Sequence, residues 1–230
     1  MPLELIFLGH SAFKLSAGDA HVLIDPFLSG NPAAPHTAGL RADDIPATHV
    51  VLTHGHADHL GDTAAIAQRT DCVVHAPFEL CNYLGEAHSL SKLEPTQPGG
   101  KVALAGTDGF AAYTQAFHSS SYEGTYLGPC CGVVVRLGGV TVYHAGDTAL
   151  FSDMKLIGEL YKPDVAILPA GDRFTMGPEH ASLAADFVGA PVAIPCHFNT
   201  WPPIEVDISE FKPKKAEVKL IEPGASITVG

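Results

Sequence analysis

The stretch Thr53–His59, THGHADH, places three histidines and one aspartate within six positions: His54, His56, Asp58 and His59. Imidazole nitrogens and carboxylate oxygens are the usual protein ligands of divalent transition metals. Taken alone, the stretch has three interpretations: a metal cage, a cluster of pH-titrating groups, or a polar loop rich in histidine. Titrating histidines without a metal would crowd like charges together, which disfavours the second interpretation.

The strand predicted before this stretch explains the spacing of the histidines. If the chain stays extended after Thr48–Leu52, side-chain alternation puts His54 and His56 on the same face, where both rings can reach one point. Asp58 and His59 follow where the chain turns towards a helix. They are therefore expected to reach a second point a few ångströms away.

The same arrangement recurs three times, since a single ligand follows each of three further predicted strands. His118 ends Phe110–Phe117, Asp147 follows Val140–Tyr143, and His197 follows Val192–Ile194. Five histidines and two aspartates are enough for two divalent ions that share one bridging carboxylate. Ions about 3.5 to 4 Å apart would also share a water and convert it into a hydroxide nucleophile. This recurrence favours the metal cage.

The elements that must position these residues are short strands and a few helices. Strands are predicted at Leu3–Leu8, His21–Asp25, Thr48–Leu52, Cys72–His75, Val102–Leu104, Phe110–Phe117, Val133–Leu137, Val140–Tyr143, Val165–Leu168, Val192–Ile194 and Val218–Ile221. Helices are predicted at Asp62–Arg69, Phe78–Leu84, Leu150–Tyr161 and Glu179–Val188, the last after Pro178. Gly138–Gly139 predicts a two-residue hairpin. The mixture indicates an α/β sandwich with helices outside the sheets, in a single domain over residues 1–230.

Composition restricts the partners. The chain has 230 residues, a net charge of -12 and only 13 lysines and arginines, so nucleic acid is a poor partner and a small-molecule substrate is favoured. No apolar window is long enough to span a membrane. Cysteines 72, 81, 130, 131 and 196 form no CxxC pair, which is typical of a reducing, cytoplasmic compartment. A homo-oligomer is compatible with these features.

Beyond the histidine motif, several stretches resemble one family. They are GHSAFKL, IDPFLSGNP, THGHADHLGD, YHAGDT, LFSDMKLIGELYKPD, FTMGPEHA and HFNTWPPI, which together span residues 9 to 204. The chain resembles the metallo-β-lactamase superfamily, in the branch of metal-dependent hydrolases related to ascorbate-6-phosphate lactonase. The resemblance implies a four-layer αββα sandwich with a dinuclear site at one edge.

The resemblance also assigns roles to the ligands. It implies that His54, His56 and His118 hold one ion, that Asp58, His59 and His197 hold the other, and that Asp147 bridges them. The donor set favours zinc and also suits manganese, iron or nickel. The implied activity is hydrolysis of a small ester, lactone, amide or phosphoester by the bridging hydroxide.

Further residues near the motifs have candidate roles. Asp58 can orient the attacking water, and His10 and His180 are the candidate proton donors for the leaving group. Asp25 is a candidate acceptor for the free N–H of a metal-bound histidine. His144 is expected to be a buried, hydrogen-bonded histidine rather than a ligand. No function is assigned to His21, His36, His49, His75 or His88.

Three alternatives remain within the same fold. A phosphodiesterase or ribonuclease would need a basic exosite or an inserted arm, and the sequence shows neither. An oxygen-reducing diiron protein usually has Glu at the second histidine of the motif and an added flavin domain, and this sequence shows neither feature. A non-catalytic metal-binding protein would retain the same ligands.

Overall fold

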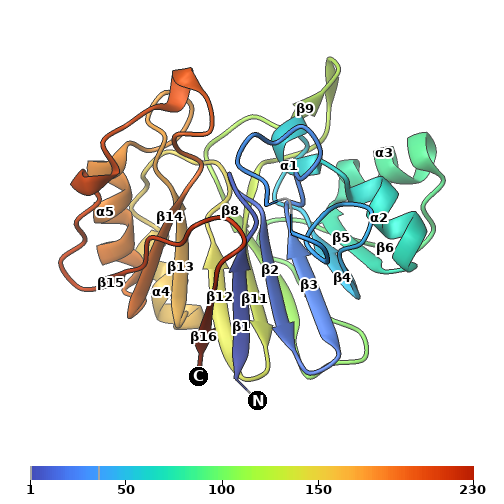
Figure 1. The fold of residues 1–230 in the computed structure, drawn as a ribbon, viewed down its shortest axis with the longest axis horizontal. Helices are drawn as coiled ribbons and strands as arrows, with labels where there is room; N and C mark the ends of the chain where they lie inside the picture. The colour runs from blue at the N-terminus through green and yellow to red at the C-terminus, as the bar shows by residue number, and fades with distance from the viewer. Residues whose placement is uncertain (1, 36) are drawn as a thin grey trace.

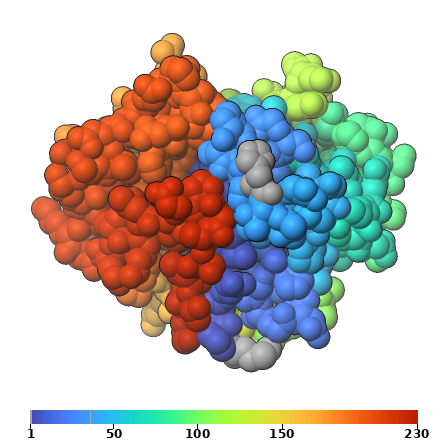
Figure 2. Space-filling view, in the orientation of Figure 1, coloured from blue at the N-terminus to red at the C-terminus, as the bar shows by residue number. Residues whose placement is uncertain are grey.

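The computed structural model describes residues 2–35 and 37–230, so His36 lies outside the described residues. Two seven-stranded sheets pack face to face, with helices on the outer face of each, which gives the predicted αββα sandwich (Figure 1). Figure 2 shows that the N-terminal part, in blue and green, lies on one side of the molecule and the C-terminal part, in orange and red, on the other. None of the helices in the described ranges has the length and apolarity needed to cross a bilayer.

The first sheet is built mainly from the N-terminal part of the chain. Its strands, in spatial order, are β16 (Ser226–Val229), β1 (Leu3–Phe7), β2 (Phe13–Ala17), β3 (Ala20–Ile24), β4 (His49–Val51), β5 (Val73–Pro77) and β6 (Leu93–Thr96). Its outer face is covered by α2 (Thr63–Thr70) and α3 (Phe78–His88), and the short α1 (Ala57–Leu60) lies at its upper edge in Figure 1.

The second sheet comes from the rest of the chain. Its order is β15 (Glu217–Val218), β14 (Val192–Cys196), β13 (Val165–Pro169), β12 (Val140–His144), β11 (Cys131–Leu137), β8 (Phe110–Gln115) and β7 (Lys101–Ala103). The helices α4 (Met154–Tyr161) and α5 (Pro178–Val188) cover its outer face. A small hairpin of β9 (Ser121–Tyr122) and β10 (Thr125–Tyr126) projects from the upper edge (Figure 1).

Three apolar cores hold these layers together. The central core lies between the sheets and takes alternate residues of each strand, such as Leu3 and Leu5 of β1 and Val133 and Val135 of β11. This is the pattern expected when two sheets interdigitate their inner faces. The other two cores lie between each sheet and its own helices.

Strand direction determines where the site forms. In the first sheet, β2 is antiparallel to both β1 and β3, and β3 is parallel to β4. Strands β1, β3 and β4 therefore run in the same direction. In the second sheet β8 and β12 are both antiparallel to β11, and β12 is parallel to β13 and β13 to β14. The carboxyl ends of β8, β12 and β14 therefore lie together, and the predicted ligands follow those ends.

The element predictions differ from the structure at several boundaries. The predicted hairpin at Gly138–Gly139 is confirmed, with Leu137 paired to Val140. The predicted helix Leu150–Tyr161 begins only at Met154, because residues before it form a loop whose Ala149 N–H bonds to the carbonyl of Phe117. The predicted strand at Phe110–Phe117 ends at Gln115. Strands β2, β6, β9, β10 and β16 were not predicted.

Candidate metal centre

The predicted ligands converge at one edge of the sandwich. Three groups each have donor atoms within 4.8 Å of one another, and the third, Asp25 with His54 and His59, shares a histidine with each of the other two. Of those two, one comprises His54, His56 and His118, and the other His10, Asp58, His59 and His197. We call them the first and second groups, and together with Asp147 they form the candidate centre. The family resemblance implied this grouping, except that His10 joins the second group directly.

The first group is a set of three facing imidazoles. His54 and His56 flank Gly55 in the loop between β4 and α1, with His54 Nε2 3.0 Å from His56 Nδ1. The ring of His118 lies edge-on to both, at centroid distances of 5.4 Å from His54 and 5.0 Å from His56. Three imidazole nitrogens that face one point form a common transition-metal donor set.

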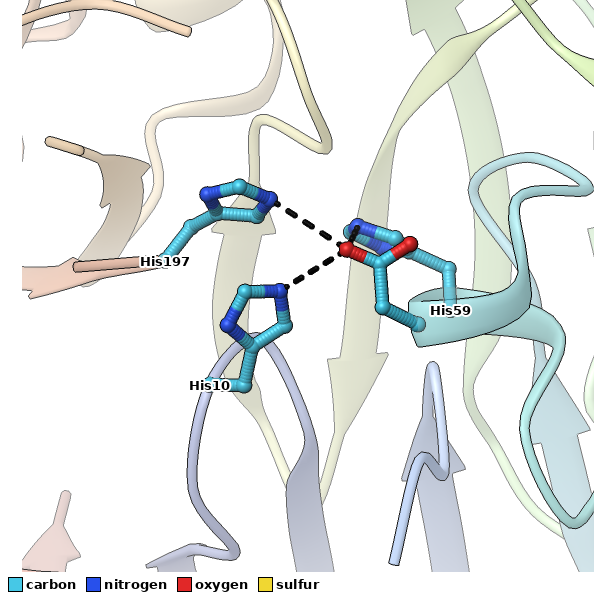
Figure 3. Close-up of side chains that lie close together, drawn as sticks. His10, His59 and His197 are labelled. Atoms are coloured by element: carbon cyan, nitrogen blue, oxygen red, sulfur yellow. Dashed lines mark hydrogen bonds and ion pairs between the residues drawn. The ribbon is translucent and has the colours of Figure 1, made fainter. Parts of the chain in front are cut away.

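The second group surrounds one carboxylate oxygen. Asp58 Oδ2 lies 3.0 Å from His10 Nε2, 3.6 Å from His197 Nε2 and 3.9 Å from His59 Nε2 (Figure 3). Asp58 and His59 lie on α1, whereas His10 and His197 come from loops after β1 and β14. Those loops are joined by a backbone hydrogen bond from the N–H of His197 to the carbonyl of His10.

Asp147 lies between the two groups. Its Oδ1 is 3.3 Å from His59 Nε2, and its Oδ2 is 3.1 Å from His197 Nε2 and 3.6 Å from His118 Nε2. The turn that brings it there requires Gly146, which has φ 62° and packs so closely that a Cβ atom would lie 2.3 Å from the carbonyl oxygen of Cys131. One carboxylate thus faces histidines of both groups.

Unpartnered buried atoms show that the residues fit a metal. His59 Nε2 and Asp147 Oδ1 are buried and form no hydrogen bond, although they face each other across 3.3 Å. Leaving buried polar atoms unpaired costs roughly 1–3 kcal/mol each. Divalent ions would use both atoms as ligands, so the donor set and its orphaned atoms are both consistent with a metal centre.

Burial and charge act against each other in the centre. Burial alone would lower the pKa of His197, but the Asp147 charge and the hydrogen bonds with Asp147 and Asp58 together outweigh burial and raise that pKa to about 9. Burial would raise the pKa of Asp147, but His197 and His59 hold it well below the usual range. His10 is dominated by burial, which lowers its pKa to about 4 despite its hydrogen bond to Asp58. Without metal, therefore, protonated histidines balance the buried carboxylate.

Asp25 orients one histidine of each group through hydrogen bonds. It follows β3 with φ 45°, and its Oδ2 accepts hydrogen bonds from His59 Nδ1 at 2.7 Å and from the Thr53 hydroxyl at 2.6 Å. Thr53 Oγ1 in turn lies 3.0 Å from His54 Nδ1, which donates to it. One buried carboxylate therefore orients a histidine of each group and leaves both Nε2 atoms free as ligands. The sequence suggested the acceptor role of Asp25 but not the link through Thr53.

Replacing Asp25 with asparagine tests this support. Asp25 uses both oxygens as acceptors, since Oδ1 also accepts from the Thr53 N–H, and the amide keeps only one acceptor oxygen and no charge. We therefore expect zinc affinity about 10- to 100-fold weaker. Competition with a chromophoric chelator measures the change, with Asp108→Asn, an exposed residue of the opposite edge, as the matched control. Unchanged affinity in Asp25→Asn would rule out the shared support.

His10 is held more firmly than the sequence predicted. Its ring is bonded on both nitrogens, by Asp58 Oδ2 at 3.0 Å and by Thr200 Oγ1 at 2.8 Å, and it stacks on Trp201 with centroids 4.7 Å apart. If Nε2–H donates to Asp58, Nδ1 must accept from the Thr200 hydroxyl. The position of Thr200 just after His197 suggests that it lines the pocket, but its hydrogen bond with His10 joins loops 190 residues apart, and local sequence does not predict that pairing.

The structure does not bring His180 to the centre. It lies in the first turn of α5 and lines a separate surface hollow of about 350 Å³ with Asp172, Glu179 and Glu210. His144 is buried and satisfied: its Nε2 bonds to the carbonyl of Ser11 at 3.0 Å, and its Nδ1 accepts from the N–H of Gly146.

Comparisons with known proteins show the family of the chain. The family profile described as "Beta-lactamase superfamily domain" matches residues 20–198. A UPF0173 metal-dependent hydrolase of Bacillus mycoides is 45% identical over 235 residues, covering 99% of this chain and 100% of the relative.

Solved structures show the same fold. The metallo hydrolase Igni18 of Ignicoccus hospitalis superposes with a TM-score of 0.88 at 36% identity, covering 100% of this chain and 99% of that one. A possible metal-dependent hydrolase of Veillonella parvula has a TM-score of 0.76 at 22% identity, with 100% of both chains covered, and supports the fold alone.

Proposed function

Because the chain belongs to the β-lactamase superfamily and is a metal-dependent hydrolase, we propose that it holds two divalent ions and hydrolyses a small ester, lactone, amide or phosphoester. The observation that carries the proposal is the position of Asp147, whose two oxygens face His59 on one side and His197 and His118 on the other. A carboxylate in this position is suited to bridge two ions.

The first ion is assigned to His54, His56 and His118, the second to Asp58, His59 and His197, and Asp147 to both. When bound, such a pair of ions supplies Lewis acidity and a water of lowered pKa. Zinc is the proposed metal because imidazole nitrogens dominate the donor set. Manganese, iron and nickel accept the same ligands, so metal analysis of the purified protein has to distinguish them.

Asp58 is proposed to orient the attacking water. Its side chain is 26% exposed, whereas that of His59 is fully buried, so solvent reaches the centre at this carboxylate. His10 fixes Oδ2 by a hydrogen bond, which leaves Oδ1 free of hydrogen bonds from any described residue. The Oδ1 atom can therefore accept a hydrogen bond from the attacking water and direct a lone pair of that water at the substrate.

His10 is better placed than His180 to act at the centre. It contacts Asp58 and stacks on Trp201 at the edge of the centre, whereas His180 lies in a different hollow. Because burial lowers the pKa of His10 to about 4, its ring is neutral near pH 7 and positions Asp58 through the Nε2–H hydrogen bond. Asp58 could then take a proton from the attacking water and deliver it to the departing oxygen or nitrogen.

His118→Ala tests the proposed function. Removing one of three imidazoles of the first group should lower kcat/KM by at least about 100-fold, since a catalytic ion would be weakly held. Metal-loaded wild type and variant would be assayed on lactones, esters, amides and phosphoesters. His88→Ala, at the end of α3, is the matched control. If His118→Ala matched the wild-type rate on every substrate, the proposal would fail.

A further inference from the structure

The ring of His10 is enclosed within the second group. Its Nε2 lies 3.0 Å from Asp58 Oδ2 (Figure 3), its Nδ1 lies 2.8 Å from Thr200 Oγ1, and it stacks on Trp201 at a centroid distance of 4.7 Å. The residue is only 1% exposed. Solvent water therefore has little access to either nitrogen, and the two protein partners determine how the ring is placed.

The Asp58 carboxylate determines which nitrogen of this ring carries hydrogen. An ionised carboxylate accepts hydrogen bonds and cannot donate them, so His10 Nε2 must be the donor in that contact. A neutral imidazole has one N–H, which leaves Nδ1 as an acceptor. Among the described residues, the Thr200 hydroxyl is the single hydrogen-bond partner of Nδ1, so this hydroxyl must donate to the ring.

The Thr200 hydroxyl has a second acceptor within reach, and distance decides between the two. The carbonyl oxygen of Phe198 lies 3.5 Å from Oγ1, whereas His10 Nδ1 lies at 2.8 Å. O–H donors normally lie about 2.5–3.0 Å from their acceptors, so the contact with Phe198 is at most weak. Because a hydroxyl has a single hydrogen, that hydrogen points to His10.

The two loops that bring these residues together have an uncommon backbone conformation. His10 has φ 57°, His197 has φ 54° and Asn199 has φ 53°, a left-handed region that residues other than glycine rarely adopt. The N–H of His197 donates to the carbonyl of His10, and Asn199 Oδ1 accepts from the N–H of Val206 at 2.8 Å. Such conformations persist where surrounding contacts hold them, often at functional sites. The loop conformation therefore fixes Thr200 beside His10.

We infer that Thr200 is a positioning residue that acts on Asp58 through His10. Its hydroxyl donates to His10 Nδ1, which holds the ring in place and polarises it, so that Nε2–H becomes a stronger donor to Asp58 Oδ2. The inference rests on the proposed function, in which Asp58 is a ligand of the second ion and orients the attacking water. The Oδ1 atom of Asp58 keeps its direction only while Oδ2 is held, so Thr200 fixes a residue of the centre that it does not bond to.

Nitrogen NMR detects this chain of hydrogen bonds without a substrate. Spectra of metal-free protein carrying ¹⁵N-labelled histidine would be recorded at pH 8, with the signals of His10 identified by their loss in His10→Ala. We expect a protonated Nε2 and a bare Nδ1 in the wild type. Thr200→Val, which replaces the hydroxyl with a methyl group of similar size, should move the Nδ1 signal downfield, towards an unbonded nitrogen, and Thr200→Ser should restore it. A protonated Nδ1 in the wild type, or no shift in Thr200→Val, would overturn the inference.

Zinc affinity tests whether the effect of Thr200 reaches Asp58. In competition with a chromophoric chelator, we expect Thr200→Val to weaken the binding of one ion about 10-fold. Thr200→Ser should bind zinc as the wild type does, and so should Thr228→Val, which changes an exposed threonine of β16. In a His10→Ala background, Thr200→Val should change the affinity by less than about twofold, because the residue through which Thr200 acts is gone. An equal loss in both backgrounds would show that Thr200 acts through loop structure alone and would overturn the inference.

The same titrations separate this inference from the function on which it rests. If the wild-type protein bound a single ion, the two-ion proposal would fail, while the nitrogen signals and the affinity for that ion would still test the chain from Thr200 to Asp58. If the wild type bound two ions and Thr200→Val changed neither affinity, the positioning role would fail and the two-ion centre would stand.

Discussion

Asp147→Ala is expected to bind at most one ion per chain and to lose at least about 1,000-fold in kcat/KM, which corresponds to about 4 kcal/mol. The reason is geometric: Asp147 is the only carboxylate within the described residues whose oxygens lie within 4 Å of histidines from both groups. Removing the Asp147 carboxylate takes one proposed ligand from each of the two ions. Elemental analysis of the dialysed variant and assays on its best substrate measure the two effects.

The variant should still fold. Asp147 is the largest cause that raises the pKa of His59 and of His197, so removing its carboxylate lowers both pKa values and lets the buried rings lose their charge more readily. Circular dichroism checks the fold, and Asp108→Ala, which removes an exposed carboxylate at the opposite edge, serves as the control. An Asp147→Ala protein that kept two ions and wild-type activity would contradict the bridging role.

Metal binding should raise thermal stability, and more strongly at higher pH. Free metal at about 1,000 times Kd adds about 4 kcal/mol for each site, and Tm should rise by about 8–16 °C for one site in a chain of this size. In the metal-free protein the pKa of His197 is about 9, raised by Asp147 against the effect of burial. Below that pH a metal ion must displace the proton, so metal affinity weakens as pH falls.

The sign of this pH dependence can be checked directly. The protonated His197 stabilises the metal-free protein fully below pH about 6.5, and this contribution is lost as pH rises towards 9. The Tm difference between metal-loaded and metal-free protein should therefore grow from pH 6.5 to pH 9. A difference that stayed constant or shrank over this range would show that His197 does not exchange a proton for metal. Differential scanning fluorimetry with and without a chelator is sufficient.

Much of the centre could be predicted from the sequence because strand ends locate it. His118, Asp147 and His197 each follow a short apolar strand, and β8, β12 and β14 run in the same direction, so their ends meet. The spacing of His54 and His56 after β4 places them in one group by the same geometry. Local periodicity, together with the rule that site residues follow strand ends, was enough to predict which residues converge.

The contacts that the sequence did not show depend on chain pairing over long distances. His10 meets Thr200 and Trp201 only because the loops after β1 and β14 are brought together across the two sheets. Strand β2, FKLSA, has no β-branched residue and forms because β1 and β3 pair with it on both sides. Such elements depend on tertiary context rather than local propensity.

The placement of His180 shows the same limit. Its motif, GPEHA, predicted the start of a helix, and the structure confirms that α5 begins at Pro178. In the structure, α5 places His180 at a hollow that Asp172 and Glu210 also line, rather than beside Asp147. A motif can therefore locate a residue in an element without locating it in the site.

The number of ions bound per chain tests the central claim most directly. Metal-free protein would be titrated with zinc at pH 8, and native mass spectrometry would count the ions retained at saturation. Two ions per folded chain are predicted, with the second lost in Asp147→Ala. Saturation of the wild-type protein at a single ion, with the fold intact, would contradict the two-ion centre.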